Sequence, residues 1–446
     1  MSFADIMLSR TDADIVLVDR RHAPGGHWVD AYPFARLHMP TVMYGVDSVP
    51  FGGYGPDPDG TPGLLERATA AEIRGYYDQV LHQTFLPSGR VRFLGGVDYL
   101  GDGRLRRIVS GKERIIRFKT LVDTTYLEGS IPATSPPPFD VAPGARCVPL
   151  GELVHLKEPN DGYTVIGAGK TGQDACIWLL NAGVSADAIQ WVRPREPWLL
   201  PRYGAQPGPG LPGTLELASR ALEAAAEAES SDDLFERMEA AGVLTRIDPR
   251  VTPTAYQAAI VSDRELEQLR GINRVVRLGH VKRIEPDRII CDLGEVPTTP
   301  QTLHIHCATD GLPTPPPKPV FEEGRITLQR LRHGLAPLSA AVIAYVEATR
   351  DTLGEKNSLC VPQAFNGTPR DWIVGRLSDM ENRECWKAAP DLAEWYRSTH
   401  LGITAALGDV QDDPRVQEAL ARIEANSAAA EINLRKFAGY GLQPAE

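Results

Sequence analysis

Apolar positions along the chain alternate between helical spacing and short continuous runs that are typical of buried strands. The run 15–18 follows a segment with helical spacing, 2–9. A second run, 163–166, precedes a helical segment that ends at 181–183, and a third run, 189–192, comes next. Strands that alternate with helices in this way predict an α/β fold with parallel sheets.

Three glycines connect the second run to its helix. Gly167, Gly169 and Gly172 have the spacing G-x-G-x-x-G, in which the turn approaches a pyrophosphate and the helix N-terminus faces it. The letters G-K-T at 169–171 do not indicate a P-loop, because the first glycine that a P-loop requires is Thr164 here. The predicted NADP-binding loop residues are Gly167, Gly169, Lys170, Thr171 and Gly172.

The residues after the third run predict which cofactor is bound. An NAD site usually has an acid at this position for the ribose 2′-hydroxyl, whereas this chain has Arg193 and Arg195. Because guanidinium groups pair well with a 2′-phosphate, NADPH is favoured over NADH. The alternative is that both arginines are solvated loop residues.

The N-terminus has the pattern of the second half of such a unit. Arg193 lies 21 residues after Gly172, and Asp19 follows the run 15–18 as a ribose-binding acid would. The corresponding glycine loop would then fall just upstream of Met1. We therefore expect an N-terminal truncation, with Met1 an internal methionine and the first strand and glycine loop missing.

Four further stretches resemble the flavin-containing monooxygenases and related NAD(P)/FAD-dependent oxidoreductases. They are VDRRHAPGGHW, YPFARLHMPTVMYGV, VRFLGGVDYLGDG and TLVDTTYLEGSIPATSPPPF, and the resemblance covers roughly the first 200 residues well and 303–347 loosely. It implies a two-dinucleotide flavoprotein that binds FAD and NADP. The FAD contacts that it implies are Asp19, Arg20, Gly25, Gly26, Trp28, Leu37, His38, Val97, Thr124, Thr125 and Gln329.

Two proline-rich connectors predict the domain organisation. IPATSPPPF follows a predicted strand at 121–125, and LPTPPPKPVF follows one at 303–309. We expect two Rossmann-like domains, the second inserted in the first, plus a helical C-terminal region. The expected parts are a first FAD segment (1–140), an NADP domain (141–315) with a helical insertion (213–243), and the return to the FAD domain with C-terminal helices (316–446).

The function that these features predict is an oxidoreductase that passes hydride from NADPH to flavin and then to an unknown acceptor or O₂. The catalytic residue stays unassigned; His38 is a candidate near the flavin, and the alternative is a histidine satisfied by backbone groups. A monooxygenase fingerprint is matched at Gly151 and His155 but not at Pro149 and Pro159. The rival class is a truncated or non-catalytic NADP-binding protein that cannot hold FAD.

The composition of the chain limits the kinds of binding partner that we expect. The net charge of −11 argues against a nucleic-acid partner, and no apolar run of about 18 residues predicts a membrane span. The six cysteines form no CxxC pair, so we expect no metal site. We expect a cytoplasmic protein with a small-molecule substrate. The C-terminal helices suit either the flavin domain or a homo-oligomer interface.

Overall fold

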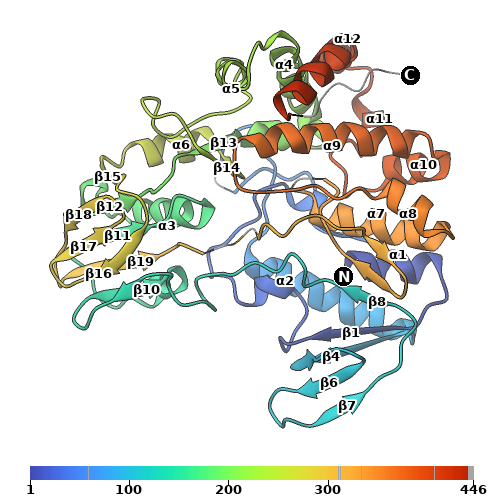
Figure 1. Ribbon diagram of the computed structural model, residues 1–446, viewed down its shortest axis with the longest axis horizontal. Coiled ribbons are helices and arrows are strands. Elements are labelled where there is room, and N and C mark those ends of the chain that lie inside the picture. Colours follow the sequence, from blue (N-terminus) through green and yellow to red (C-terminus); the bar gives the residue numbers. More distant parts are fainter. Residues whose placement is uncertain (59, 310, 312, 333, 406, 440–446) are drawn as a thin grey trace.

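The computed structural model describes residues 1–439 except 59, 310, 312, 333 and 406. Helices and strands alternate along this part of the chain (Figure 1). Strands from distant segments pair in parallel, and the antiparallel pairs among the described residues join strands that are neighbours in sequence. The fold is therefore mixed α/β, as the sequence predicts.

The largest sheet has five parallel strands and carries the glycine loop. Its order is β10 (Arg146–Pro149), β19 (Thr302–His306), β11 (Gly162–Ile166), β12 (Ile189–Val192) and β15 (Arg274–Val276). All residues of β11 and β12 are buried, as expected for strands that are covered on both faces. Helix α3 (Lys170–Asn181) connects β11 to β12 and packs beside α6 (Asp263–Arg270). The strands and the helix predicted here are confirmed.

The N-terminal half contains two small parallel sheets. Helix α1 (Ser2–Arg10) leads to β1 (Ile15–Asp19), which pairs with β4 (Val91–Gly95), while β8 (Leu121–Asp123) pairs with β21 (Arg325–Thr327). In a Rossmann sheet one further strand lies between these two pairs. The described residues therefore form this predicted sheet in two separate pieces.

Strands β8 and β21 pair although about 200 residues of sequence separate them. Leu121 lies opposite Arg325 and Asp123 opposite Thr327, and the five-stranded sheet comes between them in sequence. Both strands predicted before the proline-rich loops exist, but β8 ends at Asp123 and β19 at His306. The Asp123 carboxylate accepts hydrogen bonds from the N–H and hydroxyl of Thr125, which turns the chain away from the strand direction. The domain boundaries themselves stay predictions.

Smaller elements surround these sheets. Helix α2 (Ala70–Gln79) begins with a capping box between Thr69 and Glu72. The remaining strands are β2 (Gly45–Val46), β3 (Val49–Pro50), β5 (Val97–Tyr99), β6 (Arg104–Arg107), β7 (Glu113–Ile115), β9 (Asp140–Val141), β13 (Pro197–Pro201), β14 (Ala255–Val261), β16 (Val281–Ile284), β17 (Arg288–Cys291), β18 (Gly294–Pro297) and β20 (Phe321–Glu322).

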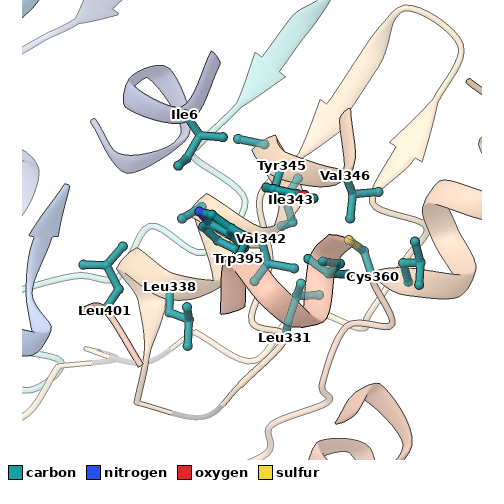
Figure 2. Packing of buried hydrophobic residues seen from close by; sticks show 14 of the residues in the cluster. Ile6, Leu331, Leu338, Val342, Ile343, Tyr345, Val346, Cys360, Trp395 and Leu401 are labelled. Atoms are coloured by element: carbon teal, nitrogen blue, oxygen red, sulfur yellow. The ribbon is translucent and has the colours of Figure 1, made fainter. Parts of the chain in front are cut away.

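One apolar core joins the two ends of the chain around α7 (Ala336–Thr349). Figure 2 shows Ile6 of α1 in the same cluster as α7 residues Leu338, Val342 and Val346. Trp395 of α10 (Pro390–Ser398) stacks on Tyr345 at a centroid distance of 4.8 Å. Residues 341–346 of α7 are all buried, as expected for a helix that is apolar on nearly every side. The helix predicted at 339–348 is confirmed.

A second core holds the C-terminal helices against the helical insertion. Helix α12 (Pro414–Phe437) lies along α4 (Leu211–Glu227), and α5 (Ser231–Ala240) and α9 (Arg370–Lys387) pack into the same core. The Asn433 side chain donates to the carbonyls of Ala225, Ala226 and Ala228 and so caps the end of α4. The face of α12 along α4 is thus buried within the chain. Short helices α8 (Leu353–Leu359) and α11 (Leu407–Val410) complete this region.

Candidate functional site

The glycine loop between β11 and α3 is as tight as the sequence predicts. Gly167 has φ +130°, and a Cβ there would lie 2.8 Å from the carbonyl oxygen of Cys307. A Cβ on Gly172 would lie 2.1 Å from the carbonyl oxygen of Gly167, which is the same oxygen that accepts a 2.8 Å hydrogen bond from Trp191 Nε1. The loop therefore requires glycine at both positions.

Helix α3 leaves its first N–H groups available for a ligand. No side chain caps it at Gly169, and Gln173 makes the first backbone bond of the helix, to the Gly169 carbonyl at 3.1 Å. Unpaired N–H groups and the positive end of the helix dipole favour an anion such as a pyrophosphate. Lys170 and Thr171 lie in this first turn.

A cavity of about 220 Å³ opens at the carboxyl ends of β11 and β12. Ligands of open α/β sheets bind at this edge. The cavity walls are mostly apolar, with His280 and Lys282 of the β16 region on its lining. Its lining residues include Phe139, Ile166, Gly167, Val192, Pro194 and Lys282.

The two arginines after β12 differ in environment. Arg193 is 2% exposed, lies 4.7 Å over the Trp191 ring, and has its Nε 3.3 Å from Glu196. Its Nε and Nη1 have no hydrogen-bond partner among the described residues, and burial lowers the pKa of the group. Arg195 is exposed. Arg193 thus has buried N–H groups that make no hydrogen bond with the described residues, while Arg195 is exposed to solvent.

Lys170 faces two carboxylates. Its Nζ lies 2.5 Å from Asp174, one helical turn along α3, and 3.9 Å from Glu265 of α6. Asp174 also accepts a 2.6 Å hydrogen bond from the hydroxyl of Tyr32. These contacts tie the N-terminal segment to the start of α3.

Glu265 is the centre of a buried ion-pair network. Its carboxylate accepts hydrogen bonds from the Ser262 N–H at 2.7 Å and from Arg202 at 2.5 Å, and Arg67 lies 4.0 Å away. Arg67 is in turn paired with Asp57 at 2.6 Å. Burial would raise the pKa of Glu265, but Lys170, Arg202, the Ser262 N–H and Arg67 together lower it to about 2. Glu265 is therefore ionised at neutral pH.

His38 lies close enough to this network for its charges to act on the imidazole. Desolvation is the largest cause that lowers the pKa of His38 to about 4, and the nearby charges of Lys170, Arg202 and Arg67 add to it against the pull of Asp174. The imidazole is therefore neutral at pH 7. His38, predicted on the flavin side, thus lies within electrostatic range of Lys170 of the predicted NADP site.

The other residues implied for FAD are spread over several elements. Asp19 ends β1 with 26% of its side chain exposed and accepts the Arg21 N–H at 2.8 Å; the adjacent Arg20 is exposed. Gly25 and Gly26 both have positive φ, at 123° and 57°. Trp28 follows them and donates to the hydroxyl of Tyr44 at 2.7 Å.

The remaining implied residues have mostly structural contacts. Leu37 and Val97 are buried at 6% and 3% exposure, and Thr124 and Thr125 are exposed after β8. The Gln329 amide bonds both backbone groups of Lys318, at 2.8 and 3.1 Å. None of these contacts tests whether the residue touches a flavin, so the assignments stay predictions.

Several residues of this site were missed by sequence reasoning. Asp174 could have been found, because it lies four residues after Lys170 on the same helix face. Ser262 and Glu265 carry the S-x-x-E signal of a capping box, which predicts the start of α6. Arg67 and Arg202 have no such signal, since each contacts Glu265, which is distant from both in sequence.

Two further findings concern metals and membranes. Across the described residues no group of three or more His, Cys, Asp or Glu side chains is arranged to hold a metal ion. Every helix in the same part of the chain is too short or too polar to cross a bilayer.

The fold and the glycine loop define a Rossmann-type α/β protein. No family model matches the sequence. A protein of Mycobacterium bovis named uncharacterized protein Mb2023 is 44% identical over 421 residues, which cover 94% of this chain and 78% of that protein. Uncharacterized protein Rv2000 of Mycobacterium tuberculosis matches to the same extent. The chain belongs to the same family as these mycobacterial proteins.

Solved structures with a similar arrangement include a monooxygenase and a hydroxylase. Cyclohexanone monooxygenase from Rhodococcus sp. Phi1, bound to NADP⁺, has a TM-score of 0.47 at 13% identity, with 95% of each chain covered. Ornithine hydroxylase (PvdA) from Pseudomonas aeruginosa has a TM-score of 0.42 at 11% identity, with 77% of this chain and 93% of that chain covered.

Proposed function

We propose that the protein is an NADPH-dependent oxidoreductase that works with a flavin. The observation that carries the proposal is the glycine loop, whose contacts exclude a side chain at Gly167 and Gly172. Such a close turn, followed by an uncapped helix, serves the approach of a pyrophosphate. The cavity beside it, between the ends of β11 and β12, would hold the adenosine part.

The preference for NADPH rests on Arg193 and Arg195. Arg193 Nη1 is buried and has no hydrogen-bond partner among the described residues, whereas its Nε faces Glu196 at 3.3 Å, so Nη1 could donate to a 2′-phosphate. Arg195, exposed at the same turn, would add a second guanidinium. No acidic side chain follows β12 directly in place of Arg193.

The flavin part of the proposal rests on two features that the sequence predicts. They are Asp19, the last residue of β1, and the turn at Gly25 and Gly26 that follows this strand. A bound flavin would supply the group that accepts hydride from the nicotinamide. His38, neutral at pH 7 and close to the start of α3, would act there as a hydrogen-bonding residue rather than as a cation. The acceptor after the flavin, O₂ or an organic substrate, is open in this proposal.

A second candidate is a nucleotide-binding protein that holds no flavin. It is favoured by one observation: β1 and β8 lie in separate sheets, and the described residues contain one strand–G-x-G-x-x-G–helix unit, at β11 and α3. Without a glycine loop beside β1, fewer backbone N–H groups would face a flavin pyrophosphate.

Titration and spectroscopy separate the two candidates. NADPH and NADH are titrated into the wild-type protein, Arg195→Gln and a control, Arg250→Gln, whose side chain is 84% exposed. We expect Arg195→Gln to weaken NADPH roughly tenfold and NADH little, since one charge-assisted contact is lost.

FAD is then added, and the visible spectrum, NADPH oxidation and O₂ uptake are followed. FAD-dependent NADPH oxidation would support the enzyme. Tight NADPH binding without flavin binding would favour the second candidate, and a protein that binds neither cofactor would refute both.

A further inference from the structure

The inward face of α9 carries charges that the sequence alone does not explain. Trp372, Arg376, Asp379, Arg383 and Trp386 follow one another at steps of three or four residues, so they share one side of the helix. The two tryptophans are 6% and 3% exposed. The charged residues between the two buried tryptophans, Arg376, Asp379 and Arg383, are half-buried.

A further arginine meets this face from the segment before α7. Arg332 is 7% exposed and donates to Asp379 at 3.3 Å and to the hydroxyl of Tyr396 at 2.5 Å. The other oxygen of Asp379 accepts a 2.7 Å hydrogen bond from the Gln363 amide. Both carboxylate oxygens of Asp379 are therefore already engaged.

The positive charge of this cluster exceeds its negative charge. Among the described residues, Arg376 contacts the Trp372 ring at 5.4 Å and has no ion pair, and Arg383 makes neither a hydrogen bond nor an ion pair. The charge of Arg332, then burial, lowers the pKa of Arg383 to about 10, so it stays protonated at pH 7. Three guanidinium groups thus gather around one carboxylate, an arrangement that is unfavourable without a further anion.

A buried donor at the same place lacks a hydrogen-bond partner. Arg332 Nε makes no hydrogen bond with the described residues, although Arg332 is only 7% exposed. Buried polar atoms are nearly always paired, so an unpaired donor beside two partly buried arginines indicates a missing acceptor.

We infer that Arg332, Arg376 and Arg383 bind the carboxylate or phosphate group of a small-molecule ligand. A guanidinium presents a planar fork of donors that matches either oxyanion, and three of them would neutralise its charge. Asp379 holds Arg332 in place and would act as a positioning residue.

Strand β14 packs near both the cluster and the glycine loop. Tyr256 lies in the same apolar core as Trp372 of α9, and the next residue, Gln257, has its side-chain oxygen 3.2 Å from the position of a Cβ on Gly169. On the proposed function, on which this step rests, the glycine loop would hold the pyrophosphate of the nucleotide, so we assign the oxyanion at α9 to the substrate.

The test uses the full chain with inorganic phosphate and succinate as probes. Melting temperature and calorimetric binding are measured in a phosphate-free buffer, with sodium chloride at equal ionic strength as the salt control. The variants are Arg376→Gln, Arg383→Gln and the control Arg397→Gln, which removes an exposed arginine of α10. We expect a roughly tenfold or greater loss of probe affinity in the first two variants and none in the control. The probe that binds more tightly distinguishes a phosphate from a carboxylate ligand.

The melting temperature without a probe separates binding from a merely structural role. Arg383→Gln relieves repulsion with Arg332, so it should melt at or above the wild-type temperature and lose the stabilisation that the probe confers. A lower melting temperature with an unchanged probe response would overturn the inference, as would a wild-type protein that neither probe stabilises beyond chloride. NADPH titrations of the same variants keep the two proposals apart, because a wild-type protein that binds phosphate but no nucleotide refutes only the proposed function.

Discussion

Replacing Gly172 by alanine tests the glycine loop through a single methyl group. The new Cβ would lie 2.1 Å from the carbonyl oxygen of Gly167 and 3.0 Å from its carbonyl carbon. Since favourable non-bonded contacts between carbon atoms lie near ~3.5–4.0 Å, the first turn of α3 must move by about 1 Å. Overpacking of this kind costs about 1–3 kcal/mol, against a gain in helix propensity of roughly 1 kcal/mol. The net effect should lower the melting temperature by a few degrees, roughly 2–4 °C per kcal/mol.

The same movement should disturb the nucleotide site more than it disturbs stability. The N–H groups of α3 that would face the pyrophosphate move with the helix, so we expect NADPH affinity to fall at least about tenfold. Gly75→Ala is the matched control, because Gly75 lies in the exposed part of α2 with no atom within 4 Å of its Cβ position. It should stabilise the protein by about 0.5–1 kcal/mol and leave NADPH binding unchanged. Equal melting temperatures and NADPH affinities in the two variants would refute the reasoning.

Three further predictions concern the buried network. The lowered pKa of Glu265 contributes stability that is present above pH 4.5 and is lost as the pH falls towards 2. Near neutral pH the unfolding free energy of the wild type should exceed that of Glu265→Gln by roughly 3 kcal/mol. Denaturant titrations should show this difference shrinking on acidification. His38 should titrate near pH 4 by NMR, and the stability that its neutral form contributes should decline as the pH falls from about 6.5 to 4. Lys170→Met should raise the pH midpoint of the His38 titration, because it removes a nearby positive charge. A midpoint unchanged by the substitution would contradict the effect assigned to Lys170.

The elements around the glycine loop could be predicted because their signals are local. The apolar run at β11, the spacing of Gly167, Gly169 and Gly172, and the helix signal after them lie within about 20 residues. Gly172 is required by a contact within this unit, and Gly167 by a contact with Cys307, the residue that follows β19. Sequence reasoning therefore located the loop to the residue.

The charge pairs and the helical packing could not be predicted in this way. Arg67 and Glu265 lie about 200 residues apart, and their proximity depends on how the N-terminal segment meets α6. The sequence from Asp371 onward shows only amphipathic spacing, which assigns no partner to its arginines. In the structure Arg376 and Arg383 are half-buried, on the side of the helix that carries the buried Trp372 and Trp386. Only tertiary structure assigns a charged face to the interior.

The charges around α3 and α9 differ in a way that bears on ligand binding. Lys170 lies at the start of α3 but already faces Asp174 and Glu265, so its charge is balanced within the chain. A nucleotide would therefore depend on backbone N–H groups and on Arg193 rather than on this lysine, as in a Rossmann loop and unlike a P-loop. At α9 the excess of guanidinium groups has no such balance among the described residues. An anion that binds at α9 would then gain affinity because it reduces the repulsion between the guanidinium groups. The nucleotide would gain affinity because the backbone N–H groups of the glycine loop and α3 are already positioned for it.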